Sequence, residues 1–160
     1  MKRYIRKKVL CLDENTYSVV DEDGNKKYEM KFEVLLGKRI CIMDELGNEV
    51  ATIQQELKSL IPRYSVYFGE EKVMDITKKF HLLPKYTIDG FGWEIRNGMM
   101  LHSYELTQAG EPVMKICRTR FGGFSAYELE ITNPWDELAA VAAAATIECA
   151  IEHEHCLTTG

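Results

Sequence analysis

The chain lacks most of the features that mark a secreted protein or a membrane protein. Its 160 residues contain five cysteines, an odd number with no Cys-x-x-Cys pair, which argues against a disulfide framework and fits a reducing, cytoplasmic setting. Basic residues near the N-terminus are not followed by an apolar run, so we expect no signal peptide. The uncharged stretch 138–147 is only ten residues long, about half of what a transmembrane helix needs, so we expect no span.

Motifs for catalysis are also absent from the sequence. There is no Gly-x-Ser-x-Gly elbow, no phosphate-binding Gly-x4-Gly-Lys-Ser/Thr loop and no His-Glu-x-x-His pair. His81 and His102 stand alone, and we interpret them as ordinary strand or loop residues. We therefore expect no enzyme activity and no cofactor.

Metal ligands gather only near the C-terminus. On a continuing helix Cys149, His153 and Cys156 would share one face, and two thiolates with an imidazole are ligands that zinc accepts. Chain ends usually fray, so the sequence favours a frayed tail over 153–160 and predicts no metal site, although it does not decide whether this cluster binds a metal.

The segment Asp21-Glu22-Asp23-Gly24-Asn25 resembles the opening of a calcium loop. An EF-hand that began at Asp21 would need Gly at its sixth position and Glu at its twelfth, where Lys26 and Phe32 stand. Its flanks have the pattern of strands. We interpret the segment as a hairpin turn and expect no calcium binding.

Composition indicates one globular domain over 1–160. Hydrophobic residues make up 46% and charged residues 28%, and the net charge is −5. Five of the first eight residues are Lys or Arg, which leaves the rest of the chain more acidic still. An acidic chain of this kind is not expected to bind nucleic acid.

Short strands account for most of the chain. Residues 27–34 and 124–131 alternate polar and apolar side chains, which is typical of half-buried strands. Asp-Gly and Asn-Gly dipeptides between the strands favour tight hairpins. Less regular strands fit residues 3–10, 16–20, 39–43, 49–54, 63–68, 72–77, 86–88, 92–96, 99–106 and 112–118. About twelve strands predict an antiparallel barrel.

One helix follows the last strand. Asn133 can cap it, Pro134 suits its first position, and Asp136 and Glu137 favour the positive end of its dipole. From Leu138 to Ile147 the helix has almost no polar residue, so it must be enclosed on all sides. We expect a central helix from Pro134 to about Ile151, surrounded by the barrel.

A weak internal repeat supports this arrangement. Gly47, Val50, Ile53 and Tyr64 recur 63 residues later as Gly110, Val113, Ile116 and Tyr127. The recurring residues fall at equivalent points of two hairpin-plus-strand units, which favours a duplicated half-barrel.

Four parts of the chain together form a recognisable pattern: Tyr4-Ile5-Arg6, the segments 17–25 and 41–53, and the helix 136–151. In their order and spacing they resemble the LURP-one-related family. The family belongs with tubby C-terminal domains and phospholipid scramblases. The resemblance implies a twelve-stranded barrel around a C-terminal helix, and relatives are linked to phosphoinositide binding, lipid scrambling or plant defence, with no shared enzyme activity.

Basic residues are the functional candidates that remain. Lys and Arg near an anionic membrane contribute about 1 kcal/mol each, so a cluster can dock a domain reversibly. Our hypothesis is a non-enzymatic module that binds anionic lipid headgroups, peripherally at a membrane; the alternative is a scaffold domain that binds a protein partner and has no lipid affinity. The candidate lipid-binding residues are Lys2, Arg3, Arg6, Lys7, Lys8, Arg39, Lys78, Lys79 and Lys85.

Overall fold

A computed structural model describes residues 2–8, 16–34, 36–80, 84–97, 103–121 and 124–159. Side chains are described for 16–34, 36–79, 86–96, 103–117 and 127–150. The strands are β1 (Lys2–Lys8), β2 (Thr16–Val20), β3 (Lys26–Val34), β4 (Lys38–Asp44), β5 (Glu49–Gln55), β6 (Arg63–Phe68), β7 (Glu71–Phe80), β8 (Pro84–Asp89), β9 (Trp93–Asn97), β10 (Tyr104–Gln108), β11 (Glu111–Phe121) and β12 (Phe124–Ile131). A 3-10 turn, η1 (Pro134–Asp136), then leads into helix α1 (Glu137–Thr159).

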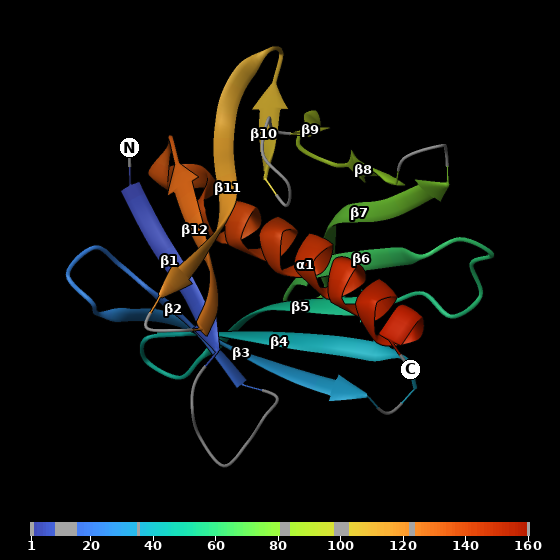
Figure 1. Ribbon diagram of the computed structural model, residues 1–160, viewed down its shortest axis with the longest axis horizontal. Coiled ribbons are helices and arrows are strands. Elements are labelled where there is room, and N and C mark those ends of the chain that lie inside the picture. The colour runs from blue at the N-terminus through green and yellow to red at the C-terminus, as the bar shows by residue number, and fades with distance from the viewer. Residues whose placement is uncertain are drawn as a thin grey trace.

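All strand pairings are antiparallel, in the order β8-β7-β6-β5-β4-β3-β2-β1-β12-β11-β10-β9. The sheet curves around α1 (Figure 1), which confirms the mainly β fold with one C-terminal helix. Within the described residues no hydrogen-bonded pairing joins β8 to β9, so closure into a barrel is not confirmed.

The β2–β3 and β4–β5 hairpin turns have the same geometry. Asp21 Oδ1 accepts hydrogen bonds from the backbone N–H groups of Asp23 and Asn25, at 3.0 and 2.9 Å. Asp44 Oδ1 accepts the equivalent pair from Leu46 and Asn48 at the same distances. These side chains therefore stabilise their own turns. The interpretation of 21–25 as a hairpin turn between β2 and β3 is confirmed.

The helical segment begins at Pro134 as the sequence predicts, but its first turn is the 3-10 turn η1, and the α-helix itself begins at Glu137. Asn133 Oδ1 accepts a hydrogen bond from Trp135 N at 3.1 Å, and Pro134 occupies the first turn. Tyr28 of β3 donates a hydrogen bond of 2.7 Å to Glu137 Oε2, which ties the helix start to the sheet. The helix continues to Thr159, beyond the expected end near Ile151, while fraying of 153–160 stays a prediction.

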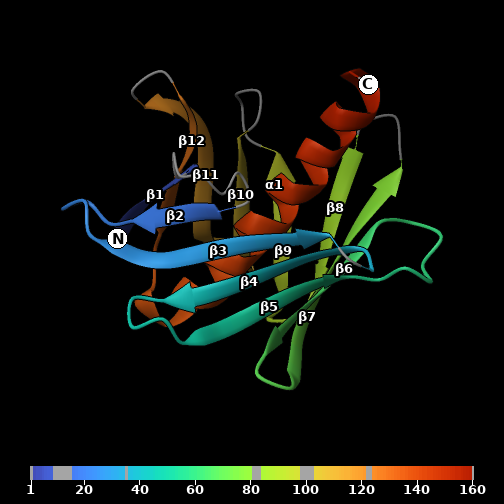
Figure 2. The ribbon, with the colours of Figure 1, turned by 90° about the horizontal axis from the view of Figure 1, so that it is seen from below.

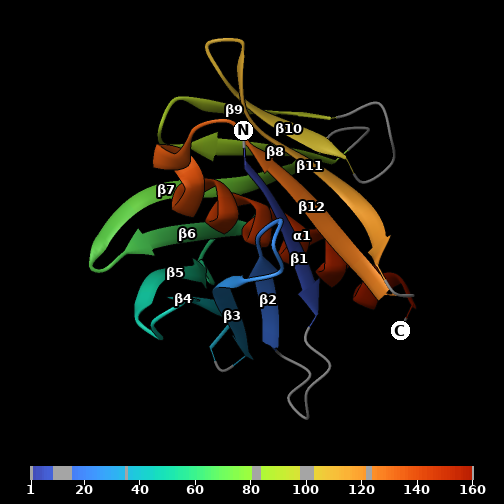
Figure 3. The same cartoon turned by 90° about the vertical axis from the view of Figure 1, so that its left-hand side faces the viewer.

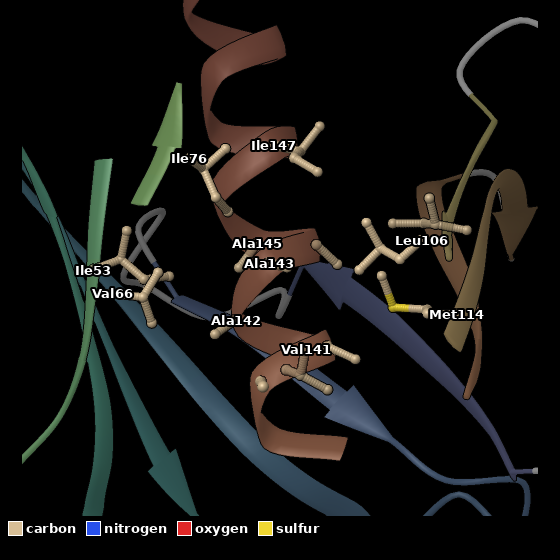
Figure 4. Close-up of a cluster of buried hydrophobic side chains, with 14 of the residues drawn as sticks. Ile53, Val66, Ile76, Leu106, Met114, Val141, Ala142, Ala143, Ala145 and Ile147 are labelled. Carbon is tan, nitrogen blue, oxygen red and sulfur yellow. The ribbon is translucent and has the colours of Figure 1, made fainter. Parts of the chain in front are cut away.

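The centre of α1 is enclosed on all sides. Residues 139–150 are all buried, including Glu148, which is 0% exposed. Thr146 donates its hydroxyl hydrogen to Ala142 O at 2.8 Å, so its polar atom is satisfied within the helix. Figure 4 shows Ile53, Val66 and Ile76 on one side of the helix and Leu106 and Met114 on the other. The small alanine side chains allow this close approach.

The repeated residues occupy equivalent places in the sheet. Ile53 in β5 and Ile116 in β11 are both 0% exposed, and Tyr64 in β6 and Tyr127 in β12 are both buried. Gly47 and Gly110 adopt φ of 83° and 84° in the turns that precede β5 and β11. In Figure 3, β1 and β12 lie together in front of α1, on the side remote from β5 and β6. Duplication of a half-barrel stays a prediction.

Because the strands alternate in direction, their connections collect at two rims. The turns 21–25, 44–48 and 69–70 lie at one rim, with the start of α1. Residues 36–37 and the connection 56–62 lie at the other rim. Figure 2 shows the C-terminal end of α1 on the same side as the β3–β4 and β5–β6 connections, away from the β2–β3 and β4–β5 turns.

Candidate functional site

Exposed aliphatic side chains gather on the two connections between β3 and β4 and between β5 and β6. We call these five residues the leucine rim: Val34 (76% exposed), Leu36 (81%), Leu57 (61%), Leu60 (103%) and Ile61 (38%). Single exposed apolar residues are common on protein surfaces, whereas a group on adjacent loops marks an interaction site.

The longer loop of the leucine rim is held at both ends by backbone hydrogen bonds. Glu56 N donates to Arg63 O at 2.8 Å, which closes the loop across its base. Lys78 N of β7 donates to Pro62 O at 2.9 Å, which fixes the end of the loop to the neighbouring strand. Leu57 and Leu60 therefore lie on a loop that is anchored at both ends.

The two loops of the leucine rim touch each other. Gly37 has φ of +91°, and a Cβ atom placed there would come within 2.8 Å of Leu57 Cδ2. Gln55 Oε1 also accepts a hydrogen bond of 3.0 Å from Lys38 N, which links the end of β5 to the start of β4. Glycine at this position lets the two loops come into contact at Gly37 and Leu57.

A network of charged and polar groups lies beneath the longer loop. Ser65, which is 0% exposed, places its hydroxyl 2.6 Å from Asp75 Oδ1 and 2.8 Å from Glu56 Oε1. Arg63 and Lys72 bind Asp75 Oδ2 at 2.9 and 3.0 Å. Burial opposes ionisation of Asp75, but the hydrogen bonds from Arg63, Ser65 and Lys72 outweigh it and lower the pKa of this carboxyl. This network fixes the base of the loop.

Cations accompany the aliphatic residues. Lys58 lies within the longer loop and is exposed. Arg39, at the start of β4, is also exposed, and its guanidinium lies 3.9 Å from a carboxylate oxygen of Glu33 and of Glu49. A shallow surface hollow is lined by Glu33, Leu36, Gly37, Arg39 and Gln54. The rim therefore combines apolar side chains with positive charge.

The predicted lipid-binding residues fall into three groups. Arg39 and Lys79 are exposed, and the antiparallel order places both near the leucine rim. Lys78 is buried, at 6% exposed, and so cannot belong to an exposed basic patch; burial also lowers the pKa of its ammonium group. The side chains of the remaining candidates lie outside the described residues: Lys2, Arg3, Arg6, Lys7, Lys8 and Lys85.

The interior contains polar groups that the sequence analysis did not place there. Glu148 of α1 is 0% exposed and Lys78 of β7 is nearly so. Burial raises the pKa of Tyr64 and of Tyr86, and the buried Tyr86 hydroxyl has no hydrogen-bond partner among the described residues. The burial of Lys78 was predictable from the sequence. Lys78 follows the apolar residues Met74 and Ile76 at two-residue spacing in β7, and side chains two apart share one face of a strand.

Metal ligands do not cluster in the described part of the chain. Among those residues no group of three or more His, Cys, Asp or Glu could hold a metal ion. Cys41, Cys117 and Cys149 are free thiols. His81 and His102, and the side chains of His153 and Cys156, lie outside the described residues, so the absence of a zinc site stays a prediction.

Of the helices in the described residues, only α1 is long enough to be compared with a transmembrane helix. Glu148 and Glu152 interrupt its apolar stretch. No described helix combines the length and the apolar character that crossing a bilayer requires.

Comparison with known proteins agrees with the fold and with the predicted resemblance. The chain is 29% identical over 135 residues to the protein YxjI of Bacillus subtilis (strain 168), covering 84% of this chain and 83% of that protein. The X-ray structure of a protein from Arabidopsis thaliana is similar with a TM-score of 0.58 at 14% sequence identity, covering 94% of this chain and 91% of that one. The family model described as LURP-one-related matches residues 1–148. The chain therefore belongs to the LURP-one-related family.

Proposed function

We propose that this protein is a non-enzymatic binding module that docks on anionic membrane lipid through the side that carries the leucine rim. The observation that supports this proposal is that five exposed aliphatic residues lie beside exposed cations, which are Lys58 of the longer loop, Arg39 of β4 and Lys79 of β7. An anionic bilayer attracts the cations and also accepts apolar side chains at its surface.

The distribution of charge supports this orientation. Lys58 and Lys79 are exposed at or near the leucine rim. Carboxylates dominate the turns of the opposite rim, which include Asp21, Glu22, Asp23, Asp44, Glu45 and Glu70. A net charge of −5 would repel an anionic surface if the charges were spread evenly. Their separation lets one side approach while the other faces solvent.

Co-sedimentation with liposomes tests the proposal. We expect binding to vesicles that contain phosphatidylserine and weak binding to pure phosphatidylcholine. Binding to the anionic vesicles should decrease as salt rises above physiological ionic strength, because the screening length is already about 8 Å there and shortens further. Lys58→Glu with Lys79→Glu should weaken binding more than tenfold, since each cation contributes about 1 kcal/mol near the surface and reversal adds repulsion.

A matched control separates position from net charge. Lys26→Glu with Lys115→Glu changes the charge equally, but Lys26 lies by the opposite rim and Lys115 lies along β11. This double variant should retain most of the binding. Equal retention on neutral and anionic vesicles, or none on either, would overturn the lipid proposal and leave the scaffold domain with a protein partner as the better interpretation.

A further inference from the structure

We infer that the leucine rim penetrates the bilayer, so that Leu36, Leu57 and Leu60 lie below the headgroups while the cations beside them remain at headgroup level. This inference rests on the proposed lipid function and adds to it a defined anchor and a fixed orientation. Electrostatic docking alone would require only the cations.

The side chain of Leu60 protrudes from a loop whose backbone is held at both ends. Leu60 is 103% exposed and Leu36 is 81% exposed. The loop that carries Leu60 is nevertheless closed by Glu56 N to Arg63 O and held by Lys78 N to Pro62 O. An anchored loop loses little conformational entropy when it enters a new environment, so apolar surface presented in this way is available for binding.

The two loops lie against each other, so their exposed apolar side chains can enter the bilayer together. Leu57 of the longer loop approaches Gly37 of the shorter one so closely that a Cβ atom at Gly37 would lie 2.8 Å from Leu57 Cδ2. Penetration by two adjacent loops buries more apolar area than either loop could bury alone, and the free energy of transfer grows with that area.

The shape and composition of the leucine rim favour a lipid surface over a protein as its binding partner. The leucine rim is convex at Leu60, whose side chain stands clear of the rest of the chain, and all five of its residues are aliphatic. Protein interfaces are instead enriched in aromatic residues and Arg at their centres. Lys58 lies between Leu57 and Leu60, and a lysine can bury its methylene chain among lipid while its ammonium group reaches the headgroups. Aliphatic protrusions with such a cation among them fit an anionic lipid surface.

The depth of penetration is limited by the backbone. Loops expose N–H and C=O groups that hydrocarbon cannot satisfy, so they cannot cross the bilayer. Carboxylates also lie directly behind the loop, at Glu56 and Asp75. The anchor should therefore reach only the boundary between headgroups and acyl chains, as interfacial segments do.

Tryptophan fluorescence tests the inference in the full chain. Trp93 is buried and Trp135 is 92% exposed at the opposite rim. Trp135→Phe therefore removes the exposed tryptophan and leaves the buried Trp93 as the remaining source of tryptophan emission. In that background Leu60→Trp should shift to shorter wavelength on vesicles of phosphatidylcholine and phosphatidylserine, and lipids brominated on their acyl chains should quench it. Leu46→Trp is the matched control, because Leu46 is 82% exposed on the β4–β5 turn of the opposite rim, and its emission should not change.

Serine substitutions measure the contribution of the anchor. Leu36→Ser with Leu60→Ser should weaken vesicle binding by about a hundredfold, about tenfold for each leucine, and the binding that remains should be more sensitive to salt. Leu46→Ser should bind as the unmodified chain does. Thermal unfolding of each variant should be unchanged, because all three leucines are exposed.

The possible results distinguish penetration of the bilayer by the leucine rim from docking on anionic lipid alone. Salt-sensitive binding to anionic vesicles with no quenching at position 60 and no effect of the serine substitutions would overturn the anchor and leave lipid docking standing. No binding to any vesicle would overturn both. Quenching at position 60 together with a loss of binding in the serine variant supports both.

Discussion

Asp75 is the residue on which the base of the leucine rim depends. Its carboxylate accepts from Arg63 and Lys72 through one oxygen and lies beside the Ser65 hydroxyl through the other. A serine hydroxyl has one hydrogen to donate, and here it faces both Asp75 and Glu56. Because Arg63 and Lys72 are both cations in contact with Oδ2, they favour the ionised form of Asp75.

Asp75→Asn should destabilise the fold by about 1–3 kcal/mol at pH 7, because charge-assisted hydrogen bonds at a buried position are lost. The folded state lowers the pKa of Asp75 from its ordinary value of 3.8, so its contribution is present above about pH 4 and is lost as the pH falls through the lower folded value. Urea unfolding at pH 7 and at low pH measures this difference.

The variant and the unmodified chain should converge in stability at low pH. Glu71→Gln is the control, since Glu71 is an exposed neighbour in the same strand and should change stability little. A deficit in Asp75→Asn that is equal at both pH values would contradict the assignment of the effect to the carboxylate charge.

A second prediction concerns the Asp21 turn. Asp21 Oδ1 is already used by the N–H groups of Asp23 and Asn25, and the hydrogen bond from Asn25 is the main reason why the pKa of Asp21 is lowered. Asp21→Ala should lower the melting temperature of the chain, and calcium should not raise the melting temperature of either form. Asp44→Ala removes the equivalent interactions and should behave alike. A calcium-dependent rise that vanishes in Asp21→Ala would refute the hairpin interpretation.

Single residues also show where inference from sequence ends. The turn at Asp21 was predictable because its hydrogen bonds are local and depend on residues two and four positions away. The exposure of Leu36 and Leu60 was not, because it depends on which segments cover them, and such contacts are distant in sequence. The contact of Gly37 with Leu57 likewise exists only after β4 and β5 have paired.

At the scale of the element, α1 imposes the tightest packing. Ala143 is 0% exposed between the two halves of the sheet (Figure 4). Ala143→Leu should overpack this site and reduce the free energy of unfolding by about 1–3 kcal/mol. Chemical denaturation measures the change, and Thr132→Leu, at an exposed position just before the helix, is the control for added apolar volume. Unchanged stability in Ala143→Leu would place the helix at the surface.

Elements were predicted well where the local signal is strong. Residues 16–20, 63–68 and 124–131 form strands with the predicted bounds, and Asn133 caps the helix segment. Periodicity and turn residues suffice for these features. Strand pairing at the edges is different, because it depends on the curvature accumulated over the whole sheet. The barrel closure that the sequence predicted is for that reason the part of the fold that is not confirmed.

At the scale of the whole molecule, strand alternation creates the separation of the two rims. Each antiparallel hairpin returns the chain to the rim from which it came, so the acidic turns collect at one rim and the connections that carry the exposed aliphatic residues collect at the other. Neither the sequence of a single loop nor its net charge indicates this arrangement. It follows from the order of the strands, and it gives the molecule one side suited to an anionic surface.

Hydrogen exchange on vesicles should report this orientation directly. If the leucine rim faces the bilayer, amides in 56–62 and 36–38 should become protected when phosphatidylserine vesicles are added, because water is excluded from the loops. Amides in the turns 21–25 and 44–48 should exchange at the same rate with or without vesicles, because the opposite rim faces solvent. The comparison is internal, since both rims are measured in one sample.

The same experiment on Leu36→Ser with Leu60→Ser, at a lipid concentration that saturates binding, separates orientation from affinity. Loop protection should fall even when the variant is fully bound, because its loops remain at headgroup level. Protection at the turns 21–25 and 44–48 in place of the loops would mean that the acidic rim faces the membrane. The separation of charge between the rims would then have no part in docking.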